Sequence, residues 1–299
     1  MDDAMEEAAL VPPWKTCVVL SMSYFFIYTA FESIQNLQSS LNHEDGLGVA
    51  SLAITYSSMM IGTFIGPVSV RAVGPKNLIL VGFFFHLLYI LANFRPSYAT
   101  LVPSSILLGF GISGLAMSMG LYLTASSKSF LFYSALSTSR LHGVLSMFNG
   151  FFYSCFTGTH ISGNFISSMI LFSSSYNETI LEDNVCGAAV CAASGNATVI
   201  DDPDQKVVFT LLGVFAAFNL TGTVLTALCL PRLHVAAYQT DSPKHQNVCA
   251  NLSGCCKKFI SWKFVILAPL FTAQAMAVMT MYTGYTKVSE SCVGCLQDK

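Results

Sequence analysis

Charged residues are scarce in this chain. Asp, Glu, Lys and Arg make up only 10 % of its 299 residues, whereas a soluble domain carries about 25 %. So few charges could not cover a surface that faces water, but a surface that faces lipid needs none. The net charge of −2 does not suggest a nucleic-acid partner. Apolar residues reach 53 % and the mean hydropathy is +0.59, so we expect a multi-pass membrane protein embedded in the lipid bilayer.

The chain also lacks the motifs of soluble catalysis. It contains no P-loop, no HExxH zinc-protease motif, no GxSxG elbow and no pair of carboxylates within one apolar stretch. The sequence therefore predicts no cofactor, no metal site and no enzyme. A cleavable signal peptide is not expected either, because the acidic segment 1–10 leads through Pro12 and Pro13 directly into the first apolar stretch.

Several apolar stretches are long enough to cross a bilayer, which takes about 20 helical residues. They cover residues 16–36, 49–70, 77–94, 100–125, 143–172, 207–230 and 264–284. The expected fold class is all-α, a polytopic transmembrane helical bundle. The number of stretches invites comparison with seven-helix receptors, and orientation decides whether that comparison holds.

Basic residues are distributed unevenly over the connecting segments, and they remain on the side from which a chain inserts. With a cytosolic N-terminus, the outer segments hold only Arg95, Lys206, Lys287 and Lys299. The inner segments then hold Lys15, Arg71, Lys76, Lys128, Arg140, Arg232, Lys244, Lys257, Lys258 and Lys263. We therefore expect a cytosolic N-terminus and an extracellular or luminal C-terminus, which is the reverse of a seven-helix receptor.

The long segment 173–206 carries signals of an outer compartment. Asn177 and Asn196 begin glycosylation sequons. Cys186 and Cys191 form a close pair suited to a disulfide, with free thiols as the alternative because sequence alone does not fix pairing. A further sequon at Asn219 lies inside a predicted span and is expected to stay unmodified, as is one at Asn251 in the inner loop.

Four polar side chains inside the predicted spans are the candidate binding residues: Glu32, Gln35, His160 and Asn164. An ionisable group at membrane depth is costly, so it faces the bundle interior or water. One interpretation is a polar path or ligand pocket lined by the spans 16–36, 100–125 and 143–172. The other is ordinary hydrogen bonding between helices, with Glu32 extending outward to the membrane interface.

Small residues predict where helices approach closely. The spacings Gly62-x-x-x-Gly66 and Gly158-x-x-x-Ser162 place small residues one turn apart, and several glycines lie in the stretch 100–125. In lipid, no hydrophobic effect drives helices together. Small residues let the helix backbones approach closely, so van der Waals packing holds the helices together instead.

Four sequence patterns together resemble the Unc-93 family, a branch of the major-facilitator-like membrane proteins named for a regulatory subunit of a potassium channel complex. The patterns are Leu37-Gln-Ser-Ser-Leu41 with Glu44-Asp-Gly-Leu-Gly-Val49, Leu101-Val-Pro-Ser-Ser-Ile-Leu-Leu-Gly109, Gly163-Asn164-Phe-Ile-Ser-Ser168, and Cys-Gly-x-x-x-Cys at 186–191. The resemblance covers nearly the whole chain, except about ten N-terminal residues and the inner loop 235–258.

The resemblance implies a fold of twelve helices in two halves, each half built from inverted three-helix repeats. This chain would then consist of a cytosolic N-terminus (1–15), a six-helix N-terminal half (16–230), a cytosolic linker (231–263), a seventh transmembrane helix (264–284) and an outer tail (285–299).

For function, the resemblance implies a regulatory or accessory subunit that acts by helix contact on another membrane protein, such as a potassium channel. The alternative is a major-facilitator-type transporter with Glu32, Gln35 and His160 facing a cavity. Transporters often pair an acidic and a basic residue in the loop after the second helix, but here Val70 precedes Arg71. A third interpretation is a truncated fragment that does not act alone.

Overall fold

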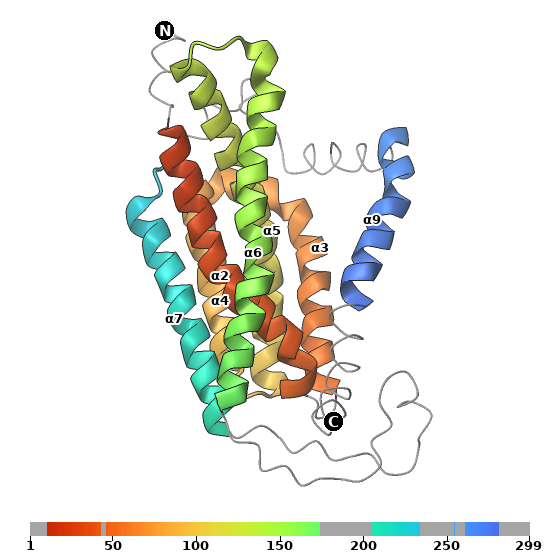
Figure 1. Ribbon diagram of the computed structural model, residues 1–299. Helices are drawn as coiled ribbons and strands as arrows, with labels where there is room; N and C mark the ends of the chain where they lie inside the picture. The colour runs from red at the N-terminus through yellow and green to blue at the C-terminus, as the bar shows by residue number, and fades with distance from the viewer. Residues whose placement is uncertain (1–10, 43–45, 174–204, 234–253, 255–260, 281–299) are drawn as a thin grey trace, which may run out of the picture.

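The structure is a computed structural model that describes residues 11–42, 46–173, 205–233, 254 and 261–280. The longer described elements are all α-helices, and a single 3-10 turn, η2 (Thr138–Arg140), precedes α6 (Figure 1). The helices are α2 (Pro13–Leu41), α3 (Leu47–Val73), α4 (Pro75–Ala92), α5 (Tyr98–Tyr133), α6 (Leu141–Ser173), α7 (Gln205–Cys229) and α9 (Trp262–Thr280). The expected all-α helical membrane bundle is confirmed.

Each predicted stretch coincides with one of these helices, and most helices extend a few residues further at both ends. Five helical segments are apolar and long enough to cross a membrane: Pro13–Gln38, Leu47–Val73, Pro75–Ala92, Tyr98–Tyr133 and Gln205–Cys229. Neither α6 nor α9 is among them. Polar side chains occur along much of α6.

Local sequence explains several helix ends. Pro13 and Pro75 occupy the first turns of α2 and α4, where a missing N–H costs nothing. Gly74 separates α3 from α4 with φ of +83°, a conformation that favours glycine. A capping box starts α5, because the Ser97 hydroxyl accepts from the Thr100 N–H while the Thr100 hydroxyl accepts from the Ser97 N–H.

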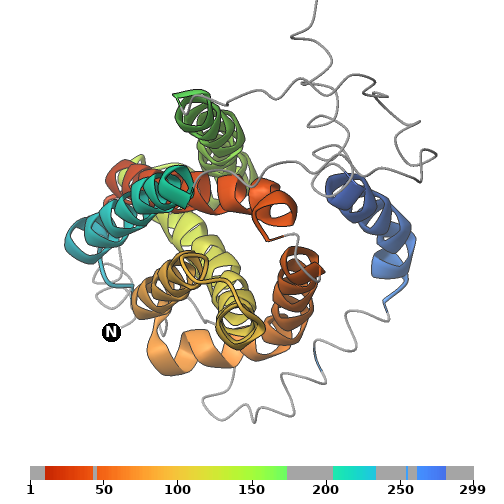
Figure 2. The same ribbon diagram turned by 90° about the horizontal axis from the view of Figure 1, so that it is seen from below.

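Helices α2 to α7 form one bundle (Figure 2), and the main contacts of its first three helices match those of its last three. Helix α2 packs on α6 and α7, α5 packs on α3 and α4, and the pairs α2–α5 and α4–α7 also touch. Exchanging α2 with α5, α3 with α6 and α4 with α7 turns this set of contacts into itself. Two three-helix repeats of opposite orientation produce this pattern. Figure 2 shows α9 apart from the bundle, and among the described helices it has no extended contact.

Glycines permit the closest helix contacts between α3 and α5. A Cβ added at Gly109 would collide with the Thr55 carbonyl oxygen and the Ser58 side chain, and one at Gly62 would collide with the Ser113 hydroxyl. The predicted role of glycines in these two helices is therefore confirmed.

In α6 the glycine of closest approach differs from the predicted one. A Cβ at Gly158 would meet only Phe25, at an ordinary 3.6 Å, whereas a Cβ at Gly163 would collide with Ser33 and lie 2.8 Å from the Thr29 carbonyl oxygen. Gly163 forms the close contact because it, and not Gly158, faces the α2 backbone.

The two ends of the bundle carry different numbers of basic residues. Alternation of the helices places Arg95 and Lys206 at the end where α4 finishes and α7 starts. The opposite end, where α2 starts, carries Lys15, Arg71, Lys76, Lys128, Arg140 and Arg232.

Candidate functional site

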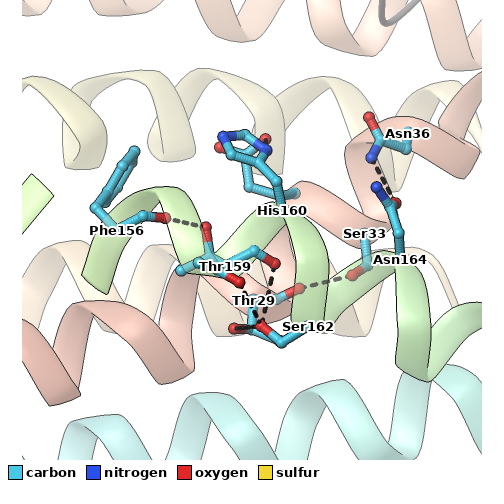
Figure 3. Close-up of polar contacts among 10 residues, drawn as sticks. Thr29, Ser33, Asn36, Phe156, Thr159, His160, Ser162 and Asn164 are labelled. Carbon is cyan, nitrogen blue, oxygen red and sulfur yellow. Dashed lines mark hydrogen bonds and ion pairs between the residues drawn. The ribbon is translucent and has the colours of Figure 1, made fainter. Parts of the chain in front are cut away.

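Polar side chains join α2 to α6 in the C-terminal half of α2 (Figure 3), whereas aromatic rings of the two helices pack together before it. The Asn36 amide nitrogen donates to the Asn164 side-chain oxygen at 2.9 Å, and the hydroxyls of Thr29 and Ser162 are 3.2 Å apart. We call this set the α2–α6 polar strip; its members are Thr29, Glu32, Asn36, His160, Ser162 and Asn164.

Glu32 and His160 form the ionisable part of the strip. His160 Nδ1 lies 3.6 Å from Glu32 Oε2, beyond hydrogen-bond distance but within the range of an ion pair when the imidazole is protonated. The Glu32 side chain is only 9 % exposed, whereas that of His160 is 35 % exposed. Glu32 thus lies inside the bundle and does not extend to its surface.

Close backbone approach makes these contacts possible. Gly163 lets α6 come against the Thr29 carbonyl and the Ser33 side chain. The Ser33 hydroxyl donates to that same carbonyl oxygen at 2.7 Å, so its own hydrogen-bonding requirement is met within α2. A larger residue at position 163 would separate the helices and lengthen every contact of the strip.

Gln35 follows Glu32 by about one turn of α2, but its side chain contacts α3 and not α6. It is buried and hydrogen-bonds to the side chain of Tyr56 in α3. Tyr56 and Tyr28 both lie close enough to Glu32 for an electrostatic interaction. The structure therefore places Glu32, His160 and Asn164 in the contact between α2 and α6, and their role in binding stays a prediction. The third helix beside them is α3, where the stretch 100–125 was expected.

His86, which was not among the predicted residues, is 1 % exposed in α4. Its Nδ1 lies 2.8 Å from the Gly82 carbonyl oxygen, and its ring packs 5.7 Å from that of Tyr28 and 5.2 Å from that of Phe31. Nε2 has no hydrogen-bond partner within the described residues. An ionisable residue in the middle of the apolar stretch 77–94 was the available signal.

A second polar network, also not predicted, ties the ends of α2, α3 and α4 together. Gln38 Nε2 donates to Ser51 Oγ at 3.3 Å, and the Tyr89 hydroxyl lies at the same distance from Ser51 Oγ. Asn42 Nδ2 donates to Asn93 Oδ1 at 2.9 Å. Tertiary packing alone brings these residues together, so no sequence pattern identifies them.

Lys76, close to the loop after the second predicted span, contacts the end of α7. Lys76 Nζ donates to the carbonyl oxygens of Ala227 at 2.8 Å and Leu230 at 2.7 Å, which caps the C-terminal end of α7. The Tyr122 hydroxyl donates to the Pro231 carbonyl oxygen at 2.7 Å. Lys76 and Tyr122 thus fix the point where the chain leaves the bundle.

Other candidate features lie elsewhere. Asn177, Asn196, Cys186 and Cys191 fall outside the described residues, whereas Asn219 is fully buried in α7. Within the described ranges no three His, Cys, Asp or Glu residues group as a metal site. A cavity of about 250 Å³ lies between α3, α4 and α5, away from the polar strip.

Sequence comparison places these features in a family context. The family described as "Ion channel regulatory protein UNC-93" matches residues 39–293. Protein unc-93 homolog A of Xenopus laevis is 29 % identical over 279 residues, covering 91 % of this chain and 58 % of that protein. Protein unc-93 homolog A of Mus musculus is 33 % identical over 224 residues, covering 73 % and 48 %.

A nematode protein matches over a similar length of this chain. The "Putative potassium channel regulatory protein unc-93" of Caenorhabditis elegans is 28 % identical over 286 residues, covering 92 % of this chain and 39 % of that protein. The chain spans about half the length of the curated relatives it matches. With the family match extending over most of its residues, this chain belongs to the Unc-93 family.

Proposed function

We propose that this multi-pass membrane protein is an accessory subunit that regulates an ion channel by contact within the bilayer. Its family is described as ion channel regulatory, and the name of the nematode relative points to potassium channels as the first class to test. The exposed part of the α2–α6 polar strip is the observation that carries the proposal.

Asn164 is exposed and the His160 side chain is 35 % exposed, although both lie well inside a long helix of the bundle. Polar groups at such depth are unfavourable against hydrocarbon, so they face protein or water. On the same helix, Ile161 and Phe165 are 76 % and 63 % exposed. An apolar surface with a polar centre fits a transmembrane helix that presents its own hydrogen-bonding side chain.

A transporter is the second candidate function, and the Glu32–His160 pair favours it. Ionisable residues between helices often mark a proton or substrate path. Alternating access rocks one half of such a protein against the other. The present chain spans about half of its relatives' length.

Co-expression with potassium channels tests the regulatory function. We expect the chain to change the current of at least one channel type. His160→Leu and Asn164→Leu should abolish this effect at an unchanged surface level. Ser154→Leu is the matched control, because Ser154 is exposed on α6 outside the strip and its hydroxyl donates within its own helix, to Gly150. Unaltered currents across several channels, or full activity of both strip variants, would contradict the proposal.

A further inference from the structure

Glu32 is the only acidic side chain within the ranges that the structure describes. It is 9 % exposed, and its Oε2 lies 3.6 Å from His160 Nδ1 across the contact between α2 and α6. A carboxylate inside a helical bundle favours a positive charge close to it, because charges interact strongly where water is scarce. A protonated imidazole at His160 supplies this charge, whereas a neutral one does not.

The charge of the His160 ring depends on pH in the physiological range. An imidazole changes charge between about pH 5 and pH 8, whereas ordinary carboxylates, lysines and phenols keep theirs. The present separation of 3.6 Å is too long for a hydrogen bond. Protonation of the ring therefore draws the two side chains toward a charge-assisted hydrogen bond, and loss of the proton releases it.

The surroundings of the pair keep their charge over this range. The phenols near Glu32, which are neutral throughout it, are those of Tyr28 in α2, Tyr56 in α3 and, beyond Tyr28, Tyr153 in α6. His86 of α4 packs its ring against that of Tyr28. The described parts of α5 and α7 contain no acidic residue, and their lysines stay protonated. A proton that this contact takes up therefore belongs to Glu32 and His160 together.

Other contacts of the α2–α6 polar strip hold the two helices together at every pH. The Asn36–Asn164 hydrogen bond joins two amides, and the hydroxyls of Thr29 and Ser162 likewise do not titrate. The stabilisation that the ionisable pair adds is different, because it requires the imidazolium form. It is therefore present at acidic pH and is lost as the pH rises.

We propose that Glu32 and His160 form a pH-sensitive latch between α2 and α6, closed when the imidazole carries a proton and open when it is neutral. His160 also belongs to the exposed surface of α6 that we assign to channel contact. A protonated ring has no acceptor nitrogen left for a partner helix. Regulation of a channel should then weaken at acidic pH, a consequence that rests on the proposed function.

The latch is tested on the purified full chain in nanodiscs by a double-mutant cycle with Glu32→Gln and His160→Gln. Melting temperatures of the wild type, both single variants and the double variant are measured at acidic and alkaline pH, about 5 and 8. We expect the changes of the two single variants to add at alkaline pH. At acidic pH the double variant should lose less than their sum, since each single variant already opens the latch.

His142→Gln is the matched control, because His142 is an exposed histidine near the start of the same helix. A cycle that pairs it with Glu32→Gln should be additive at both pH values. If Glu32→Gln does not fold, His160→Gln alone takes the place of the cycle. Its loss of melting temperature relative to the wild type should be larger at acidic than at alkaline pH, whereas that of His142→Gln should be the same at both.

Additive changes at both pH values, or an equal deviation from additivity at both, would overturn the latch. The cycle uses the chain alone, so its outcome does not depend on any channel. Coupling at acidic pH without an effect on currents would contradict the proposed function and leave the latch standing. An effect on currents without such coupling would do the reverse.

Discussion

The ammonium group of Lys76, at the start of α4, donates a 2.7 Å hydrogen bond to the backbone carbonyl of Leu230, just beyond the end of α7. The last carbonyls of a helix have no partners within it and carry a partial negative charge. Lys76 thus caps the C-terminal end of α7.

Replacing Lys76 should therefore destabilise the bundle. Lys76→Met keeps the apolar stem but loses the charged donor, and we expect a loss of about 1 kcal/mol. The free energy of unfolding in a denaturing-detergent titration measures this loss. Arg71→Met is the matched control, because Arg71 is exposed in the last turn of α3 and has no hydrogen bond or ion pair among the described residues. Equal stability of the two variants would contradict the capping role.

Gly163→Ala should separate α6 from α2. The added Cβ would meet the Ser33 hydroxyl and the Thr29 carbonyl oxygen, and overpacking of this kind costs about 1–3 kcal/mol. Gly150→Ala in the same helix is the control, since no atom lies within 4 Å of its added Cβ. The same titration measures both variants. If Gly163→Ala were as stable as Gly150→Ala, this result would contradict the close contact of Gly163 with α2.

The Asn36–Asn164 hydrogen bond should produce a measurable coupling energy between substitutions at these two positions. Hydrogen bonds between membrane helices contribute about 0.6 kcal/mol on average. A double-mutant cycle with Asn36→Leu and Asn164→Leu should give a coupling of about that size. A parallel cycle that pairs Asn36 with Asn149 should give almost none, because Asn149 donates to Leu145 in its own helix. Purely additive losses in the first cycle would show that the contact contributes nothing.

Glycosylation tests the orientation of the chain. The basic residues at the end where α2 starts support a cytosolic N-terminus, which would place the segment 173–206 outside. Asn177→Gln and Asn196→Gln should each increase gel mobility by one glycan. Asn219→Gln should not alter mobility, because Asn219 is buried in α7. A wild-type chain that an endoglycosidase leaves unchanged would refute the outer position of this segment.

The pairing of Cys186 with Cys191 can be read from thiol labelling. In the intact protein we expect neither to react with a maleimide until a reductant is added. Cys186→Ser should expose the thiol of Cys191 without reductant. Cys229, a free and exposed cysteine at the end of α7, provides the reference for a reactive thiol. Labelling of Cys186 and Cys191 in the untreated wild type would exclude the disulfide.

Helix positions were predictable from the sequence because a membrane span is identified by its own apolar composition. The apolar stretch 49–70, for example, lies entirely within α3. Glu32 and His160 were identifiable for the same reason, as rare ionisable residues in apolar surroundings. Their 3.6 Å contact was not identifiable, since it depends on which helices pack together and in which rotation.

The sequence could not show which residues of different helices contact one another across the bundle. Tyr56 lies in an unremarkable part of α3 and joins the site only because α3 lies beside α2. The misassigned glycine in α6 has a similar cause. The rotation of α6 decides that Gly163 meets the α2 backbone at Thr29, whereas Gly158 meets only the Phe25 ring.

The contact pattern of α2 also constrains how the protein is made. Its main packing partners are α6 and α7, which are synthesised more than 90 residues after α2 ends. At about 5–20 residues per second, the first helix waits several seconds or longer before either partner emerges from the ribosome. During that interval the Glu32 carboxylate has no His160 beside it. A factor that shields this helix during the interval should therefore raise the yield of folded protein without changing the stability of the finished bundle.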